Sequence, residues 1–512
     1  MTVSTGRSLA SRKKSSPGEK GSKDPSQEPL RVFFLASEVS PVAKTGGLAD
    51  VSKALPLALA AEGVDVRIGT VAFRGVDALP GFSLRKTFAV QAAGGGQTFR
   101  LFEGSLGSGA VPVYALDPNG LFDRPGLYGE GGGEYPDNLL RFSLWSYGLL
   151  ALPKILGFSP RILHANDWQA ALSVPLLPLL WGEDHSRSLR TVLSVHNMAY
   201  QGVYPLSEWR MTGLPSAYNH FDALEFHGQL SLLKGGIQFA DFVTTVSPSY
   251  RDEVLSEPEG FGLSGALRHR GKRFVGLLNG IDEEEWNPGT DPHLPVTFSP
   301  DSLDAKERLK LEMKSAWGVS GSGPLFGVVS RMASQKGLGI LARGLLSEGY
   351  RKNPIGEWVV LGSGDPELEA LWRDVAARYP GRVHLKTGFD EGLSHRIIAA
   401  CDFLFVPSVY EPCGLTQMYA MRYGTLPIVN PTGGLRDTVL PDRTGLWLKS
   451  LSEEGILEGI VRARDLLMTP KRMREMRLSA MGVDSSWKGR AKDYIRLYRE
   501  ALSLPSWHLP RR

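Results

Sequence analysis

The sequence is poor in cysteine and has neither a long apolar run nor a strong excess of one charge. Its 512 residues include two cysteines, Cys401 and Cys413. Two cysteines are too few for a disulfide framework, so we expect a reducing compartment such as a bacterial cytoplasm. The longest strongly apolar stretch, residues 170–181, is interrupted by prolines and too short to cross a bilayer. These absences argue against a secreted protein and against membrane attachment through a spanning helix.

The formal net charge of +4 comes mostly from the first 29 residues, where six lysines and arginines accompany three acidic residues. The remainder is close to neutral and carries no basic stripe, which argues against a nucleic-acid partner. Residues 1–29 lack the apolar centre of a secretion signal and have the composition of a disordered tail. A plastid transit peptide is the alternative for this tail, although its acidic residues count against it.

From residue 30 onward, short apolar runs alternate with longer helical patterns such as 48–61 and 138–156. This alternation is typical of a parallel sheet covered by helices on both faces. The candidate strands of the first half are 32–36, 66–71, 113–116, 162–165, 191–195, 242–246 and 275–278. After an irregular stretch, those of the second half are 326–329, 358–361, 383–385, 403–406, 426–429 and 445–448.

We therefore predict an α/β protein with two doubly wound Rossmann-like domains, at residues 30–285 and 286–484. Residues 485–512 follow them, and 487–502 read as one amphipathic helix. Open α/β sheets bind their ligands at the carboxyl ends of the strands, so two such domains would face each other across a cleft.

The K-T-G-G-L segment at residues 44–48 follows the first predicted strand. Gly46 and Gly47 let the backbone approach a ligand closely, and the following helix start favours an anion such as a diphosphate. Lys44 adds a full positive charge. A plain turn with a solvated lysine is the alternative. The segment is not a P-loop, because G-x-x-x-x-G-K-[ST] is absent here.

The segment G-F-G-L-S-G at residues 260–265 matches the dinucleotide-binding pattern G-x-G-x-x-G. It follows Glu257-Pro258-Glu259 and not a strand, so the pattern lacks the structural context that dinucleotide binding requires. We do not expect it to bind a dinucleotide.

Two further segments follow predicted strands of the second half. Arg331 and Lys336 in S-R-M-A-S-Q-K-G could converge on phosphate oxygens, or could simply be surface cations. In Y-E-P-C-G-L-T-Q, Glu411 would place a carboxylate in the cleft. The alternative is a glutamate that only interacts favourably with the dipole at the start of the following helix. Backbone N–H groups of the turn that follows it could hold an anion, and they belong to Gly414, Leu415 and Thr416. Cys401 and Cys413 have no suitably spaced partners for a metal site.

Three polar residues stand near predicted strand ends in the first half. His164 lies at the end of I-L-H-A, Asn279 lies in L-N-G-I-D, and Asp137 precedes a helical pattern. A lone histidine is more often a hydrogen-bonded structural residue than a catalytic one. Its position near the carboxyl end of a strand, where α/β proteins bind ligands, makes a catalytic role for His164 more plausible.

Taken together, these segments resemble the bacterial glycogen synthase and plant starch synthase family, in order along nearly the whole chain after the tail. The matching segments include S-E-V-S-P-V-A-K-T-G-G-L-A-D-V, L-F-D-R-P-G-L-Y, H-A-N-D-W-Q-A, S-V-H-N-M-A-Y-Q-G, L-N-G-I-D, V-V-S-R-M-A-S-Q-K-G and Y-E-P-C-G-L-T-Q-M-Y. The resemblance implies a GT-B fold whose last helix crosses back onto the first domain. It also implies retaining transfer of glucose from ADP-glucose to the non-reducing end of an α-1,4-glucan, without metal or other cofactor.

The resemblance also implies roles for individual residues. Lys44, Gly46 and Gly47 would bind the donor, Arg331 and Lys336 would clamp the diphosphate, and His164 would lie at the reacting sugar. Glu411, with the backbone of residues 413–416, would hold the glucosyl group. Asn279 is a further candidate donor contact, and Asp50 and Asp137 are candidate sugar or acceptor contacts.

One position separates this family from many GT-B relatives. Those relatives have a second glutamate eight residues after the first, where this chain has Tyr419. The difference favours a glucan synthase over a hexosyltransferase that uses UDP-glucose. A binding protein without catalysis is the remaining alternative, and the retained Lys336 and Glu411 count against it.

Overall fold

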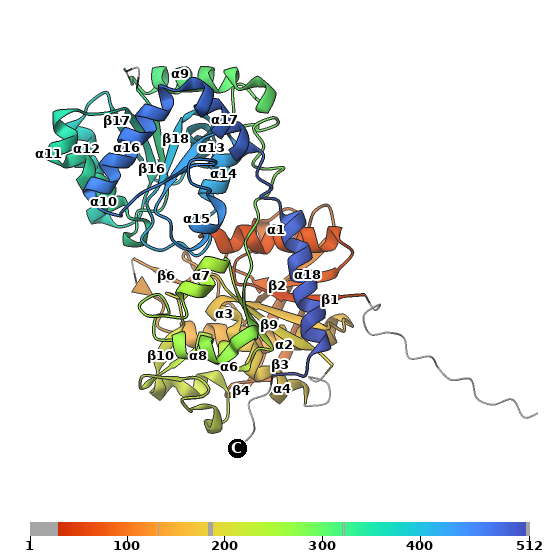
Figure 1. Ribbon diagram of the computed structural model, residues 1–512. Coiled ribbons are helices and arrows are strands. Elements are labelled where there is room, and N and C mark those ends of the chain that lie inside the picture. Colours follow the sequence, from red (N-terminus) through yellow and green to blue (C-terminus); the bar gives the residue numbers. More distant parts are fainter. Residues whose placement is uncertain (1–28, 132, 183–187, 320, 322, 508–512) are drawn as a thin grey trace, which may run out of the picture.

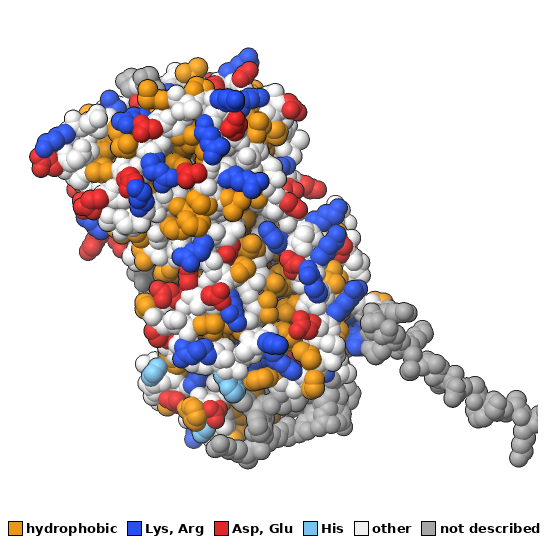
Figure 2. All heavy atoms as spheres, in the orientation of Figure 1, with side chains coloured by type: hydrophobic (Ala, Val, Ile, Leu, Met, Phe, Trp, Pro, Cys, Tyr) orange, Lys and Arg blue, Asp and Glu red, His pale blue; other side chains and the backbone are white. Residues whose placement is uncertain are grey.

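The computed structural model shows two lobes, one above the other, with the last long helix lying on the lower lobe (Figure 1). The structure describes residues 29–131, 133–182, 188–319, 321 and 323–507. The tail predicted at residues 1–29 lies almost entirely outside the described residues. Over the face in Figure 2, side chains of both charge signs are interspersed. Among the helices that the structure describes, none combines the length and the apolar character that a membrane span requires.

The lower lobe is built on a nine-stranded sheet with the order β14-β13-β9-β8-β1-β2-β5-β4-β3. Its strands are β1 (Arg31–Leu35), β2 (Asp65–Val71), β3 (Ser83–Ala92), β4 (Gly95–Leu106), β5 (Val111–Asp117), β8 (Ile162–Asn166), β9 (Arg190–Val195), β13 (Phe242–Thr245) and β14 (Phe274–Gly276). All neighbours from β14 to β5 are parallel. The seven strands predicted for this half therefore correspond to β1, β2, β5, β8, β9, β13 and β14.

The β3–β4 hairpin extends the sheet on one side and is antiparallel. This hairpin was not predicted, because most of β3 is exposed and its residues do not form a continuous apolar run. Short strands also form two small ribbons: β6 (Gly129–Glu130) with β7 (Gly133–Glu134), and β10 (Val203–Pro205) with β12 (Gln229–Ser231) and β11 (Glu225–Phe226).

Helices cover both faces of the lower sheet. They are α1 (Gly47–Ala61), α2 (Asn138–Leu156), α3 (Asp167–Ala171), α4 (Ser173–Trp181), α6 (Leu232–Phe239), α7 (Pro248–Glu253) and α8 (Ser264–Arg270). Short 3-10 turns are η2 (Val76–Ala78), η3 (Leu206–Thr212), η4 (Ser216–Tyr218) and η5 (Gly271–Arg273). Because apolar side chains pack on both sheet faces, the lobe has two separate core clusters.

The upper lobe has a six-stranded, fully parallel sheet with the order β17-β16-β15-β18-β19-β20. Its strands are β15 (Leu325–Val329), β16 (Glu357–Gly362), β17 (Val383–Thr387), β18 (Phe403–Val406), β19 (Leu426–Val429) and β20 (Leu446–Trp447). Each corresponds to one of the six predicted runs.

The helices of the upper lobe are α9 (Asp304–Ala316), α10 (Leu338–Leu346), α11 (Glu348–Lys352), α12 (Pro366–Arg378), α13 (Glu391–Ala400), α14 (Thr416–Arg422), α15 (Gly433–Thr438), α16 (Glu453–Leu467) and α17 (Pro470–Met481). Two 3-10 turns are η6 (Pro300–Ser302) and η7 (Ser334–Lys336).

The chain passes between the lobes twice, and the two connections touch. Ile281 pairs with Ser486 in an isolated parallel bridge, and the Ile281 N–H donates to Ser485 O at 2.8 Å. A side chain at Gly280 would meet the backbone of Ser486 and Trp487 within 3.0 Å, so glycine permits this close approach. The second connection leads into α18 (Trp487–Ser503), which crosses back and packs beside α1 (Figure 1).

Candidate active site

The two sheets turn the carboxyl ends of their strands toward each other, and hydrogen bonds join the loops at these ends. Ser247 Oγ, after β13, donates to Pro412 O at 2.6 Å. The Ser249 hydroxyl donates to Asp437 Oδ1 at 2.7 Å, next to a backbone bond of 2.8 Å from Ser249 N to Oδ2. The lobes are therefore in contact along the edge where α/β proteins bind ligands.

The K-T-G-G-L segment leads from β1 into α1 on the lower side of this edge. Glu38 holds it in place, since its carboxylate accepts bonds from Thr45 N at 2.5 Å and Thr45 Oγ1 at 2.7 Å. Gly46 is the extended N-cap of α1. A side chain at Gly47 would lie 3.6 Å from Leu415 Cδ1 of the upper lobe. The two candidate donor-binding segments thus face each other directly.

Lys44 and Asp50 form an ion pair of 2.8 Å at the start of α1, and both are partly exposed. Burial lowers the pKa of Lys44, but the Asp50 carboxylate outweighs it, so the net pKa of Lys44 is raised. Burial raises the pKa of Asp50, and Lys44 offsets this only in part. Lys44 therefore has a carboxylate partner within its own lobe, and an anion bound at this segment would compete with Asp50 for it.

In the upper lobe, Lys336 Nζ donates to Glu411 Oε2 at 2.6 Å, and Ser408 Oγ donates to the same oxygen at 2.8 Å. Glu411 is 5% exposed, so these bonds stabilise a largely desolvated carboxylate. Arg331 follows β15 and is exposed at the same edge. The structure therefore brings the predicted Lys336 and Glu411 together and leaves the Arg331 guanidinium accessible to a ligand.

The turn after Glu411 is compact and partly buried. Gly414 has a φ of 75°, a conformation that favours glycine, and Thr416 is the first residue of α14. Burial raises the pKa of the Cys413 thiol to about 12, although a bond from the Asn279 backbone opposes this. Asn279 is itself buried, and its side-chain Oδ1 has no hydrogen-bond partner among the described residues. Such a buried orphan acceptor at the cleft suits a ligand hydroxyl or amine.

Tyr419 lies one turn further along α14 and stacks on Trp286 at 3.8 Å, with an angle of 8° between the ring planes. Trp286 in turn stacks on His395 at 3.7 Å. A small pocket beside this stack is lined in part by Asp50, Lys53 and Leu415. Burial raises the pKa of Tyr419 well above its usual value, so the hydroxyl is neutral where many GT-B relatives carry a glutamate.

His164 does not reach the cleft. It lies on β8 without exposed surface, with Nδ1 2.7 Å from Tyr498 Oη of α18 and Nε2 2.7 Å from Ser194 Oγ. Burial, assisted by His196, lowers the pKa of His164 to about 3, so the ring is neutral. These contacts describe a residue that docks α18 onto the sheet, and they leave no ring nitrogen for a sugar.

Asp137 lies at the N-cap of α2 and is paired with Arg124 at 2.5 Å. The hydrogen bonds from Arg124 hold the pKa of Asp137 below its usual value. The carboxylate is thereby engaged in fixing the loop that precedes α2. A direct contact of Asp137 with a sugar stays a prediction.

Five residues without a predicted role lie in this part of the lower lobe: Asn166, Asp167 and His196 at the ends of β8 and β9, Glu38 after β1, and Tyr128. His196 Nε2 lies 3.0 Å from Asn166 Oδ1, and the His196 N–H donates to Asp167 Oδ1 at 2.7 Å. Burial lowers the pKa of His196 to about 4, and burial raises that of Asp167 to about 7. Tyr128 Oη donates to Glu38 Oε1 at 2.8 Å.

A signal for these residues was present in the sequence. Asn166 and His196 each stand one residue beyond a predicted strand, whereas His164 is the penultimate residue of one. A further indication comes from the structure itself. Asp167 has a φ of 55°, an uncommon conformation for a residue other than glycine. Such backbone strain often marks a functional site.

Comparisons with known proteins point to one family. Residues 31–269 match the family described as starch synthase catalytic domain, and residues 323–465 match glycosyl transferases group 1. The chain is 41% identical over 488 residues to glycogen synthase of Anaeromyxobacter dehalogenans, covering 92% of this chain and 99% of that protein. It is 40% identical over 495 residues to glycogen synthase of Thioalkalivibrio sulfidiphilus, covering 93% and 100%.

Among solved structures, the catalytic domain of starch synthase IV from Arabidopsis thaliana, bound to ADP and acarbose, is similar with a TM-score of 0.85. The identity is 33%, and the match covers 93% of this chain and 100% of that one. Sucrose-phosphate synthase from Thermosynechococcus elongatus, 18% identical with a TM-score of 0.59, shares the fold alone. The predicted GT-B fold is confirmed, and the chain belongs to the glycogen synthase and starch synthase family of glycosyltransferases.

Proposed function

We propose that this glycosyltransferase moves glucose from ADP-glucose to the non-reducing end of an α-1,4-glucan, with retention of configuration. The observation that carries the proposal is the pairing of Lys336 with Glu411 at 2.6 Å, opposite the K-T-G-G-L segment of the other lobe. Cationic and backbone donors for a diphosphate, and a carboxylate for a sugar, are thus available on two sides of one cleft. Its free, buried cysteines and its bacterial relatives support a cytoplasmic location.

The diphosphate would bind between the lobes. Arg331 and Lys336 would neutralise the charge that develops on it as the glycosidic bond breaks, and Lys44 with the Gly46 and Gly47 backbone would complete the anion site. Phe389, 82% exposed just after β17, offers a ring on which a nucleobase can stack. Asn279 Oδ1 would accept a bond from the donor, which its unpaired, buried state supports.

The glucosyl group would lie near Glu411 and the backbone of residues 413–416. We assign the place at the reacting sugar to His196 in preference to His164, because His196 stands at a carboxyl strand end and His164 is enclosed by the core. Asp50 stays a candidate sugar or acceptor contact, and its ion pair with Lys44 holds it beside the proposed donor site.

The reaction would proceed on one face of the sugar. The positive charge that builds on the anomeric carbon is balanced by the departing phosphate, and that phosphate oxygen takes the proton of the acceptor hydroxyl. A double displacement would need a free carboxylate as nucleophile, whereas Glu411 is engaged by Lys336 and Ser408. Contact between the lobes would keep water from the reacting carbon.

The test is glucose incorporation into glycogen from ADP-glucose and, separately, from UDP-glucose, each with and without EDTA. We expect incorporation from ADP-glucose that EDTA does not abolish. Lys336→Ala and Arg331→Ala should each lower kcat by about a hundredfold or more with the fold intact. Lys352→Ala, on the exposed surface of α11, is the matched control. Preference for UDP-glucose, loss of activity in EDTA, or full activity of both variants would each contradict the corresponding part of the proposal.

A further inference from the structure

The G-F-G-L-S-G segment, rejected above as a dinucleotide motif, lies between α7 and α8 and presents an aromatic ring to the outside. Phe261 is 37% exposed and has a φ of 48°. The left-handed region is unfavourable for a bulky side chain, so a phenylalanine there needs support from its surroundings.

Side chains of Gln201, Glu257 and Ser264 help to hold this loop. Gln201, which is buried, donates from Nε2 to Phe261 O at 2.9 Å. Glu257 accepts from Gly262 N at 3.0 Å and from Ser264 Oγ at 2.7 Å. These bonds fix the backbone that carries the partly exposed Phe261 ring.

The Phe261 ring meets Tyr410 of the other lobe edge-to-face, with centroids 5.7 Å apart. Tyr410 directly precedes Glu411, and its carbonyl accepts a bond from Gln335, the neighbour of Lys336, at 3.2 Å. On the lower side, Tyr200 lies near Tyr410 and is 53% exposed. Partly exposed rings from both lobes thus gather beside the loop that carries Glu411.

We propose that Phe261, Tyr200 and Tyr410 form a platform that binds glucose units of the acceptor glucan beyond the reacting end. The inference rests on the proposed function and adds the residues that hold the growing chain. Glucose units expose C–H groups on their flat faces, and aromatic faces carry partial negative charge, so the two surfaces attract. An exposed apolar cluster that continues a cleft is the kind of surface that marks a binding groove.

The platform is tested by acceptor kinetics of Phe261→Ala, Phe261→Trp and a matched control, Phe221→Ala. Phe221 is an exposed phenylalanine of the same lobe whose ring contact is with His220. We expect Phe261→Ala to raise KM for maltoheptaose by about tenfold while KM for maltose and for ADP-glucose stays within about twofold. Phe261→Trp should restore most of the affinity, and Phe221→Ala should behave as wild type.

An unchanged KM for maltoheptaose in Phe261→Ala would overturn the platform and leave the proposed transfer standing. An equal rise in KM for ADP-glucose would also overturn it, because the loop would then support the donor. If the wild-type protein transfers no glucose, calorimetric binding of maltoheptaose tests the platform independently of the proposed transfer. Weaker binding by Phe261→Ala than by wild type would then support the platform, and no binding by wild type would reject it.

Discussion

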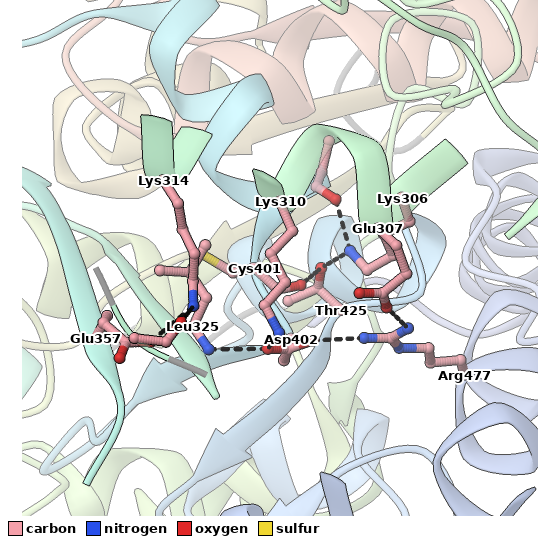
Figure 3. Close-up of polar contacts among 12 residues, drawn as sticks. Lys306, Glu307, Lys310, Lys314, Leu325, Glu357, Cys401, Asp402, Thr425 and Arg477 are labelled. Atoms are coloured by element: carbon pink, nitrogen blue, oxygen red, sulfur yellow. Dashed lines mark hydrogen bonds and ion pairs between the residues drawn. The ribbon is translucent and has the colours of Figure 1, made fainter. Parts of the chain in front are cut away.

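Lys306, on α9, is a lysine with 1% of its surface exposed. Its ammonium group donates to Ala399 O at 2.7 Å and to Thr425 Oγ1 at 2.5 Å, as Figure 3 shows. Burial lowers the pKa of Lys306 to about 7, and the Arg477 guanidinium adds to this effect. Asp402 lies nearby, but its carboxylate is already bonded to Lys310 and Arg477 at 2.6 and 2.7 Å. Folding therefore favours the neutral amine of Lys306.

The sign of the pH dependence follows from the two pKa values of Lys306, about 7 in the folded protein against 10.5 for an unperturbed lysine. Between these values the unfolded chain holds a proton that the folded protein lacks, so the free energy of unfolding rises with pH. One proton corresponds to about 1.4 kcal/mol for each pH unit, or at most about 5 kcal/mol over the whole window. Below pH 7 both states are protonated and the full penalty is present.

Lys306→Met removes the titrating group and keeps much of the side-chain volume. We expect the stability of wild type relative to this variant to increase by about 1 kcal/mol per pH unit between roughly pH 8 and 10. Urea unfolding followed by tryptophan fluorescence measures both proteins at each pH, and their difference cancels every other group that titrates equally in both. Lys352→Met, at an exposed pair with Glu348, serves as control and should give a flat difference.

A difference between wild type and Lys306→Met that stays constant from pH 8 to 10 would refute the reasoning. Lys306 would then remain charged in the folded protein, and its two acceptors together with Asp402 would outweigh the cost of burial. A slope of the opposite sign would show that folding raises the pKa of Lys306.

Three more predictions concern the candidate active site and its supports. Glu38→Gln weakens the bonds to Thr45, so KM for ADP-glucose should rise by about tenfold in steady-state kinetics while KM for glycogen changes little. His164→Ala should lower the free energy of unfolding by about 3 kcal/mol, whereas kcat of the folded fraction should stay as in wild type. His196→Ala should instead lower kcat by about a hundredfold and leave the free energy of unfolding nearly unchanged. Asp437→Asn removes a charged acceptor for Ser249 across the lobes, so kcat/KM should fall by up to about tenfold and release of free glucose should rise relative to transfer.

The two sheets could be predicted from the sequence because parallel strands are buried on both faces and appear as continuous apolar runs. All thirteen predicted runs correspond to strands of the two sheets. The β3–β4 hairpin could not be predicted in this way, because its outer strand is largely exposed and lacks such a run. β4 also pairs with β5, the strand that follows it after a short turn, so the hairpin extends the sheet as an antiparallel edge.

The proximity of Lys336 and Glu411 could be predicted, because each lies in the loop that follows a parallel strand of the same sheet. The prediction for His164 rested on the same rule, but the side chains of a strand alternate between faces and one of these faces is covered by α18. Tyr498, which bonds to His164, is 334 residues away in sequence. No local pattern shows that a helix from the other end of the chain will enclose this histidine. Asp167 and Glu38 could not be singled out for a related reason. Their hydrogen-bond partners, such as His196 for Asp167 and Thr45 for Glu38, are brought to them by the fold.

The contacts between the lobes involve the same loops that carry the candidate site. Pro412, which accepts the bond from Ser247, is the neighbour of Glu411, and Gly433, which donates to Glu253 at 2.8 Å, packs on the backbone of Glu411. Separation of the lobes would break these bonds and free the turn that positions Glu411. We therefore expect closure of the lobes to assemble the proposed sugar site, so that a donor bound to one open lobe would meet water without a completed site. Such coupling would favour transfer to a glucan over hydrolysis, because the bond to the diphosphate would be activated only when the cleft is shut.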